Sequence, residues 1–168
     1  MTLLFSILRF VHIIAAILWA GGALTMSFFI APTIGAIGDA GKQFAGYLMG
    51  KTRFTAYLTI AGVTAVLAGS LLYGIDSNWF QSGWMRTPTG IVFGIGATSG
   101  ILAFIFGAML GNANMALAAL GAQIQGKPTA EQMAAIQALQ KRQSMTAKWN
   151  MIFILIAMAM MESARLFK

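Results

Sequence analysis

The first apolar segment of the sequence carries two ionisable residues on one helix face. Arg9, His12, Ala16 and Trp19 are three, four and three residues apart, which places them on the same side of an α-helix. His12 is the single histidine of the 168-residue chain. An ionisable side chain inside a membrane helix is costly, and by default it marks a functional site. This face is therefore the first candidate for a binding or redox site.

His12 has three competing interpretations. It is a packed histidine that bonds a neighbouring helix, a ligand to haem or a metal ion, or a proton relay with Glu162. A b-type haem takes one or two axial ligands from the protein. With one histidine in the chain, the second ligand would be Met158, His12 of a second copy, or none. In this hypothesis Trp19 lines the haem pocket and Arg9 pairs with a propionate.

The last apolar segment carries a carboxylate, Glu162, which we expect to be the one acidic residue within a membrane span. In lipid such a group should be paired or protonated. If the first and last spans are antiparallel, residues at equal depth pair Arg9 with Glu162, and Arg165 is a second cation nearby. Two interpretations stay open: an ion pair that fixes the helix ends, or a charged rim around a ligand at His12.

Methionines in the last segment support copper handling as a further alternative. Thioether sulfur suits Cu(I), but methionine is also a flexible packing residue of apolar helices. The residues concerned are Met151, Met158, Met160 and Met161. No serine or threonine stands at a spacing that would form a catalytic dyad with His12. The sequence therefore assigns no catalytic residue, and it leaves open whether the protein is an enzyme.

The composition requires lipid as the main solvent. Hydrophobic residues make up 58% of the chain and charged residues 9%, whereas soluble domains carry about 25% charged residues. The net charge is +7. Because the basic residues stand mostly between apolar segments, they favour membrane topology and anionic lipid over nucleic acid as a partner. The absence of cysteine excludes disulfides and thiolate metal sites.

The apolar pattern predicts an all-α integral membrane four-helix bundle, folded as a single domain over residues 1–168. The predicted spans are residues 3–31, 54–75, 89–111 and 149–167, and Pro32 is expected to end the first. Residues 43–49 are expected to form a short interfacial helix, and residues 76–88 a short loop. A capping box of Thr129 and Gln132 predicts a cytoplasmic amphipathic helix at residues 130–147, which could be continuous with the last span.

Four spans place both termini on the same side of the membrane. The loops after the first and third spans contain seven of the eleven basic residues, so the positive-inside rule places these loops in the cytoplasm and the termini outside. The seven are Lys42, Lys51, Arg53, Lys127, Lys141, Arg142 and Lys148. Glycines four residues apart in the third span predict close helix contact. They offer a face for a homo-oligomer, or for a role as a non-catalytic accessory subunit of a larger membrane complex.

The stretch Phe10-Val-His12-Ile-Ile-Ala-Ala-Ile-Leu-Trp19-Ala-Gly21-Gly22 resembles the first helix of two groups of bacterial four-helix membrane proteins. These are the HemJ-type protoporphyrinogen oxidases and the CopD-type copper-resistance membrane domains. Ser82-Gly83-Trp84 is similar to a segment at the same place in the HemJ type. The resemblance implies a bacterial cytoplasmic (inner) membrane location. It also implies b-type haem at His12 for the HemJ type and copper for the CopD type.

This sequence departs from the HemJ pattern at two places. The family has further histidine and lysine positions after the first helix and after the tryptophan motif. Here those stretches are Ala31-Pro32-Thr33 and Arg86-Thr87-Pro88. His12 alone therefore carries over the ligand role that the resemblance implies.

Overall fold

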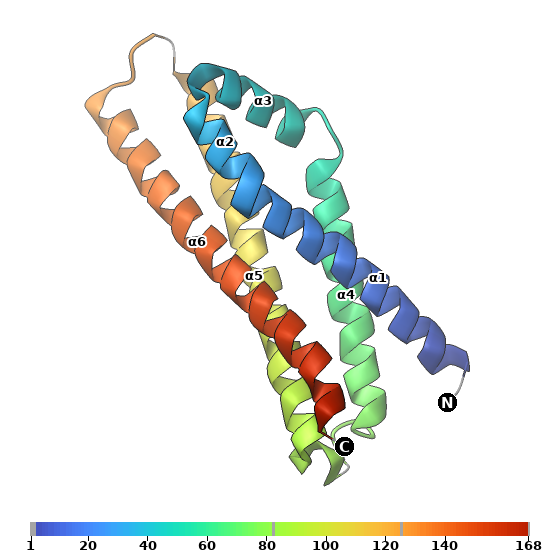
Figure 1. Ribbon diagram of the computed structural model, residues 1–168. Coiled ribbons are helices and arrows are strands. Elements are labelled where there is room, and N and C mark those ends of the chain that lie inside the picture. The colour runs from blue at the N-terminus through green and yellow to red at the C-terminus, as the bar shows by residue number, and fades with distance from the viewer. Residues whose placement is uncertain (1–2, 82, 125, 168) are drawn as a thin grey trace.

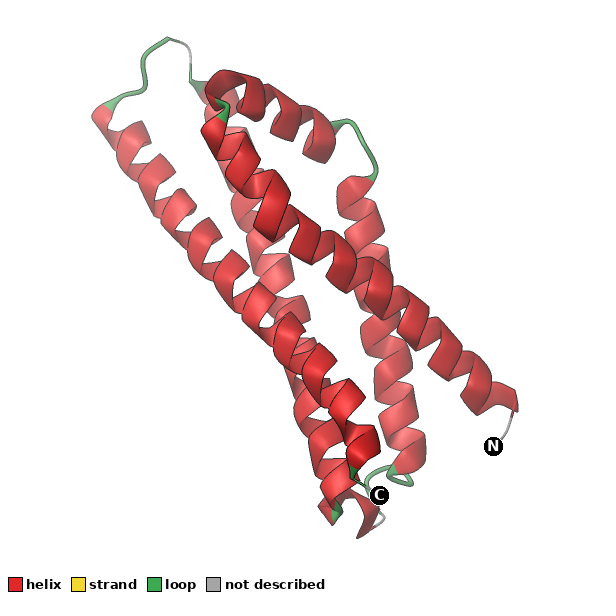
Figure 2. Ribbon diagram, viewed as in Figure 1, coloured by secondary structure: helices red, strands yellow, loops and turns green. Residues whose placement is uncertain are grey.

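The computed structural model describes residues 3–81, 83–124 and 126–167. Helices joined by short loops make up these parts (Figure 2), which confirms the predicted all-α class. The elements are α1 (Leu3–Thr25), the π-helical turn η1 (Met26–Ile30), α2 (Ala31–Ala36), α3 (Gly38–Gly50), α4 (Phe54–Asp76), the 3₁₀ turn η2 (Gly83–Arg86), α5 (Pro88–Gln123), α6 (Ala130–Ser163) and the 3₁₀ turn η3 (Ala164–Leu166).

Four helices in the described parts are long and apolar enough to cross a bilayer. They are Leu3–Ala36, Phe54–Asp76, Pro88–Gln123 and Ala130–Ser163. The 23 residues of α4 extend about 35 Å, close to the roughly 30 Å hydrocarbon core. The 36 residues of α5 extend about 54 Å, so α5 and the similarly long α6 reach beyond a bilayer. The chain has the helices of a multi-pass membrane protein.

The first apolar helix does not end at Pro32 as the sequence suggests. Helical backbone continues to Ala36, with the π turn η1 placed immediately before the proline-containing helix α2. Proline lacks an N–H, and its ring crowds the carbonyl four residues earlier. A π turn contains an extra residue and loosens the bonding pattern at that point. Thr33 adds support by donating its hydroxyl to the Phe29 carbonyl at 2.7 Å.

The predicted capping box is present and begins one continuous helix. The backbone N–H of Gln132 donates to Thr129 Oγ1 at 3.2 Å, and the backbone N–H of Thr129 donates to Gln132 Oε1 at 2.9 Å. The amphipathic helix expected at residues 130–147 and the last span are both part of α6.

At the start of α5, the Thr87 hydroxyl accepts a hydrogen bond from the backbone N–H of Gly90 at 3.1 Å. This helix continues to Gln123, well past the predicted end at residue 111.

The long helices form two pairs (Figure 1). α1 packs mainly against α4, and α5 packs mainly against α6. The pairs meet at a small cluster of Ala20, Ala103 and Ile154. Beside it, the ring of Trp19 meets the ring of Phe104 edge to face, with centroids 6.1 Å apart. Figure 1 shows both chain ends at one end of the helices and α3 lying across the other end.

The α3 helix covers the residues expected to form a short interfacial helix. Near its start, Lys42 Nζ donates to Asp39 Oδ1 at 2.7 Å. This hydrogen bond, together with the charge of Lys42, lowers the pKa of the Asp39 carboxyl below its ordinary value. Both side chains are exposed, so the pair contributes little to folding stability.

Four side chains in the described parts connect neighbouring helices by donating to a backbone carbonyl. The bonds join His12 Nδ1 to Ala65 O (2.8 Å), Tyr57 Oη to Leu18 O (2.7 Å), Tyr73 Oη to Gly90 O (3.4 Å) and Asn150 Nδ2 to Ala103 O (2.7 Å). In every case the residue four positions after the acceptor is a glycine. The glycines are Gly69, Gly22, Gly94 and Gly107, in the same order. We call each set of donor, accepting carbonyl and glycine a carbonyl clasp.

The glycine of a clasp gives the donor access to the carbonyl. In an α-helix the Cα–Cβ bond points toward the N-terminus, so a side chain leans over the turn that precedes it. A Cβ built on Gly69 would lie 2.7 Å from His12 Cε1, and one on Gly22 would lie 3.3 Å from Tyr57 Cε1. A Cβ on Gly94 would lie 3.1 Å from Tyr73 Oη, and one on Gly107 would lie 3.1 Å from Asn150 Nδ2. All four distances are shorter than ordinary van der Waals contact. A larger residue would therefore push each donor away from its acceptor.

The turn between α4 and α5 contains three consecutive left-handed residues. The φ angles of Asn78, Trp79 and Phe80 are 48°, 54° and 68°. This conformation costs roughly 1–2 kcal/mol per residue that has a Cβ. The Trp79 amide donates to the Gly74 carbonyl at 2.6 Å, and the fully buried Ser77 accepts from the Phe80 amide at 3.0 Å. These bonds hold the turn against its local strain.

Candidate functional site

His12 lies half-buried between α1 and α4. Its Nδ1 is 2.8 Å from the carbonyl oxygen of Ala65. A carbonyl oxygen can only accept a hydrogen bond, so Nδ1 carries the proton. In the neutral ring Nε2 then keeps its lone pair, which can accept a proton or bind a metal. The structure thus contains the helix-to-helix bond of the first interpretation, and this bond does not use Nε2.

The same hydrogen bond suits a ligating histidine. Histidines that bind metals almost always donate their other ring N–H to a carboxylate, a backbone carbonyl or water. That bond fixes the tautomer and the ring orientation, and it makes the ligating nitrogen more basic. The bond from His12 to Ala65 supplies this arrangement from within the α1–α4 pair. Packing and ligation are therefore compatible roles for His12.

Trp19 lies on the same α1 face, about 10 Å further along the helix. Its ring packs edge to face on Phe104, and both rings lie against Gly62. A Cβ at Gly62 would be 3.2 Å from Trp19 Cε2 and 3.1 Å from Phe104 Cδ2. The structure therefore places Trp19 at the junction of the two helix pairs.

Arg9 has an electrostatic neighbour that the sequence did not suggest. Asp76 is the last residue of α4 rather than the first of a loop, and it interacts electrostatically with Arg9. The predicted second span, residues 54–75, stops one residue short of Asp76, which the structure includes at the end of α4. Ala65, Gly69 and Asp76 are four and seven residues apart, which is the spacing of one helix face. That spacing is the sequence pattern from which a position of Asp76 on the His12 side of the second span could have been predicted.

The remaining predicted residues belong to α6. Glu162 and Met158 are both exposed, and Met158 has half of its surface accessible. α6 packs mainly on α5 and meets α1 over a short stretch only. The pairing of Arg9 with Glu162 stays a prediction. The side chain of Arg165 lies outside the described part of the structure.

The donor set around His12 limits the kind of metal site that the chain can build. Within residues 3–81, 83–124 and 126–167, no three His, Cys, Asp or Glu side chains gather as a possible metal site. A metal at His12 would take its other ligands from methionine thioethers, from a macrocycle or from a second chain. A single imidazole is a ligand that a b-type haem accepts, since the porphyrin supplies four other donors to the iron.

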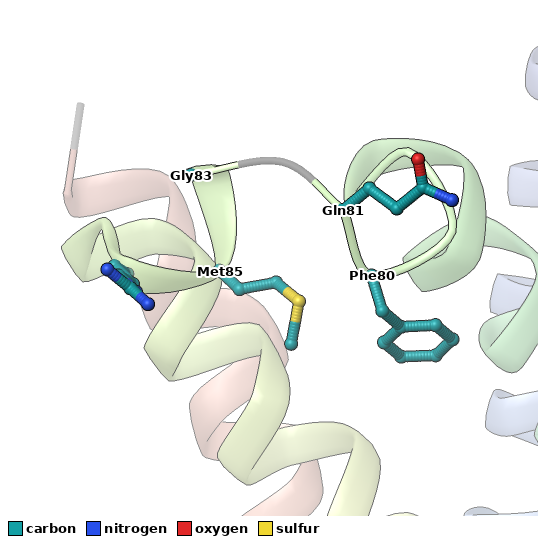
Figure 3. Close-up of a pocket in the computed structure, with 5 residues that line it drawn as sticks. Phe80, Gln81, Gly83 and Met85 are labelled. Atoms are coloured by element: carbon teal, nitrogen blue, oxygen red, sulfur yellow. The ribbon is translucent and has the colours of Figure 1, made fainter.

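A surface pocket of about 540 Å³ lies at the turn between α4 and α5 (Figure 3). In Figure 3, the side chain of Met85 extends toward the side on which the Phe80 ring lies. The lining residues are Phe80, Gln81, Gly83, Met85 and Arg86. None of the residues predicted for the functional site lines this pocket. It depends on the left-handed turn, which no sequence pattern indicated.

No family model, curated protein or solved structure matches this chain. The resemblance to the HemJ and CopD types therefore stays an expectation drawn from two short motifs. Functional inference rests on the residues of the chain itself.

Proposed function

We propose that this protein binds a b-type haem or related porphyrin within the membrane, through Nε2 of His12. The supporting observation is the hydrogen bond from His12 Nδ1 to the Ala65 carbonyl at 2.8 Å. In the neutral ring it leaves Nε2 with its lone pair, on a helix long and apolar enough to span a bilayer. A haem held this way would supply one-electron redox chemistry.

The residues near His12 have distinct roles in this proposal. The exposed guanidinium of Arg9, one turn before His12, would pair with a propionate, and it also interacts electrostatically with Asp76. Trp19 contributes an apolar wall at the junction of the helix pairs. A second ligand would come from Met158, from His12 of a second copy, or from no protein residue.

We place the protein in a bacterial cytoplasmic membrane with both termini outside. Both chain ends lie at one end of the helices (Figure 1), as an even number of spans requires. Lys42, Lys51, Arg53 and Lys127 lie in α3 or in the loops at the opposite end, and Lys141 and Arg142 lie in the half of α6 nearer that end, which favours a cytoplasmic position for it.

An accessory subunit is the alternative function, with α5 as its docking face. A Cβ at Gly100 or Gly111 would meet nothing within 4 Å. By contrast, other residues of the chain already occupy the space around the Cβ positions of four α5 glycines, which are Gly90, Gly94, Gly96 and Gly107. Open glycines on a membrane helix permit close approach of another helix. Copper handling, the further alternative, would rest on His12 and methionine thioethers alone.

An absorption spectrum of the purified protein tests these functions against each other. Haem is added to protein in detergent, and the spectrum is recorded oxidised and reduced. A shifted Soret band with sharp reduced α and β bands, saturating at one haem per chain or per pair of chains, supports haem binding. No spectral change relative to haem in empty detergent micelles contradicts it. A colourless protein that co-purifies with a defined set of membrane subunits supports the accessory role.

A further inference from the structure

The ring of His12 rests on a glycine that no other residue can replace without displacing the ring. A Cβ at Gly69 would lie 2.7 Å from Cε1, 2.9 Å from Nδ1 and 3.6 Å from Nε2 of His12. Two of these distances are below any real Cβ contact, so the ring would have to move. Nδ1, the nitrogen that donates to Ala65, is among the atoms that would be displaced.

The acceptor of this bond depends on the same glycine. The Ala65 carbonyl lies inside α4, where it faces the amide of Gly69 one turn later. Its second lone pair is open to a neighbouring helix because Gly69 has no side chain to lean back over it. Gly69 thus provides both the space for the imidazole and the access to its hydrogen-bond acceptor.

We infer that Gly69 is a positioning residue for His12: it holds the imidazole as the Nδ1–H tautomer, with Nε2 as the nitrogen that meets a ligand. The part of this inference that concerns a ligand rests on the proposed function, whereas the part that concerns the tautomer does not. A hydrogen bond at Nδ1–H orients the ring and makes Nε2 a stronger ligand. A stronger nitrogen ligand favours ferric over ferrous iron, so a haem bound at His12 would have a lower midpoint potential with this bond than without it.

The single histidine makes a direct test possible in ligand-free protein. Labelling with ring-¹⁵N histidine gives nitrogen signals from His12 only. In the wild-type protein we expect Nδ1 to have the shift of a protonated nitrogen and Nε2 that of an unprotonated one. Gly69→Ala should move both shifts toward each other or exchange them. Gly21→Ala, at an α1 glycine with nothing within 4 Å of its Cβ position, should leave them unchanged.

A wild-type spectrum with Nε2 protonated would overturn the inference, and so would wild-type shifts in folded Gly69→Ala. If Gly69→Ala does not fold, the wild-type spectrum decides alone. A haem titration then separates this inference from the proposed function. Gly69→Ala should weaken haem binding about 10–100-fold and raise the midpoint potential. Wild-type protein with the Nδ1–H tautomer that binds no haem contradicts the proposed function, whereas the tautomer assignment stands.

Discussion

The side-chain amide of Asn150 lies 2.7 Å from the Ala103 carbonyl oxygen and 3.1 Å from the position that a Cβ of Gly107 would occupy. Asn150 is only 5% exposed. A buried amide in an apolar bundle is costly unless it is hydrogen-bonded. The hydrogen bond of the clasp therefore offsets part of the cost of burying the Asn150 side chain. It also joins α6 to α5 close to the junction of the two helix pairs.

Replacing Asn150 with leucine should weaken the α5–α6 pair. Hydrogen bonds between membrane helices contribute about 0.6 kcal/mol on average and about 1.7 kcal/mol at most. We expect a loss of unfolding free energy within that range for Asn150→Leu, measured by denaturation in mixed micelles. Asn112→Leu, at an exposed position of α5, is the matched control and should change stability much less. Equal losses in the two variants would count against the clasp.

Two glycines of α5 should respond in opposite ways to alanine. A Cβ at Gly90 would overlap the backbone carbonyl of Trp84, whereas one at Gly111 would meet nothing within 4 Å. Gly90→Ala should therefore destabilise the fold by roughly 1–3 kcal/mol, as overpacking does. Gly111→Ala should be neutral, or stabilising by up to about 1 kcal/mol, because alanine is the better helix former. Melting temperatures that change in the same direction would contradict this assignment.

Arg9 should couple more strongly to Asp76 than to Glu162. The structure gives Arg9 an electrostatic interaction with Asp76, and α1 packs mainly on the helix that carries this residue. Two double-mutant cycles measure the difference, one with Arg9→Met and Asp76→Asn and one with Arg9→Met and Glu162→Gln. We expect a coupling energy of about 0.5 kcal/mol or more in the first cycle. Strict additivity in the first cycle together with coupling in the second would restore the pairing based on equal depth.

His12→Ala should abolish haem retention and leave a folded helical protein. Helicity by circular dichroism and a monodisperse peak in detergent would establish the fold, and the Soret band would report the haem. Met158→Leu should change the spectrum only if Met158 is the sixth ligand. Unchanged haem content in His12→Ala would rule out the axial role.

The orientation can be read with single cysteines, since the natural chain has none. Asp39→Cys and Lys127→Cys should react with a membrane-impermeant thiol reagent only after the cytoplasmic face is exposed. Gln81→Cys, in the turn between α4 and α5, should react in intact spheroplasts. The physical reason is the excess of basic residues in the loops expected to be cytoplasmic. The opposite labelling pattern would reverse the orientation.

Hydropathy and local chemistry predicted the helix content well. The four apolar segments and the Thr129–Gln132 capping box are read from neighbouring residues, and the structure has all of them. The passage of the first helix through Pro32 was missed, because the rule for proline assumes α geometry and η1 is a π turn. The length of α5 was missed because its alanine-rich second half is helical but no longer strongly apolar.

The site was predictable only where a single residue stood out. His12 was found because it is the one ionisable ring in a long apolar run. The equal-depth rule gives only the height of a residue along the bundle, so it indicated Glu162 for Arg9 without showing that α1 packs on α4. The carbonyl clasps were missed for a related reason. Their glycines look like any small residue until the donor on another helix is known.

The π turn has a consequence for which kinds of mutation the first helix tolerates. None of the residues of η1 is buried, so most substitutions within Met26–Ile30 should be neutral. A deletion of one residue is different, because it would remove the extra residue of the π turn and convert it to regular α geometry. Pro32 would then crowd the carbonyl four residues earlier, as a proline does inside a regular α-helix. In a screen of insertions and deletions, this stretch should be variable in composition and fixed in length.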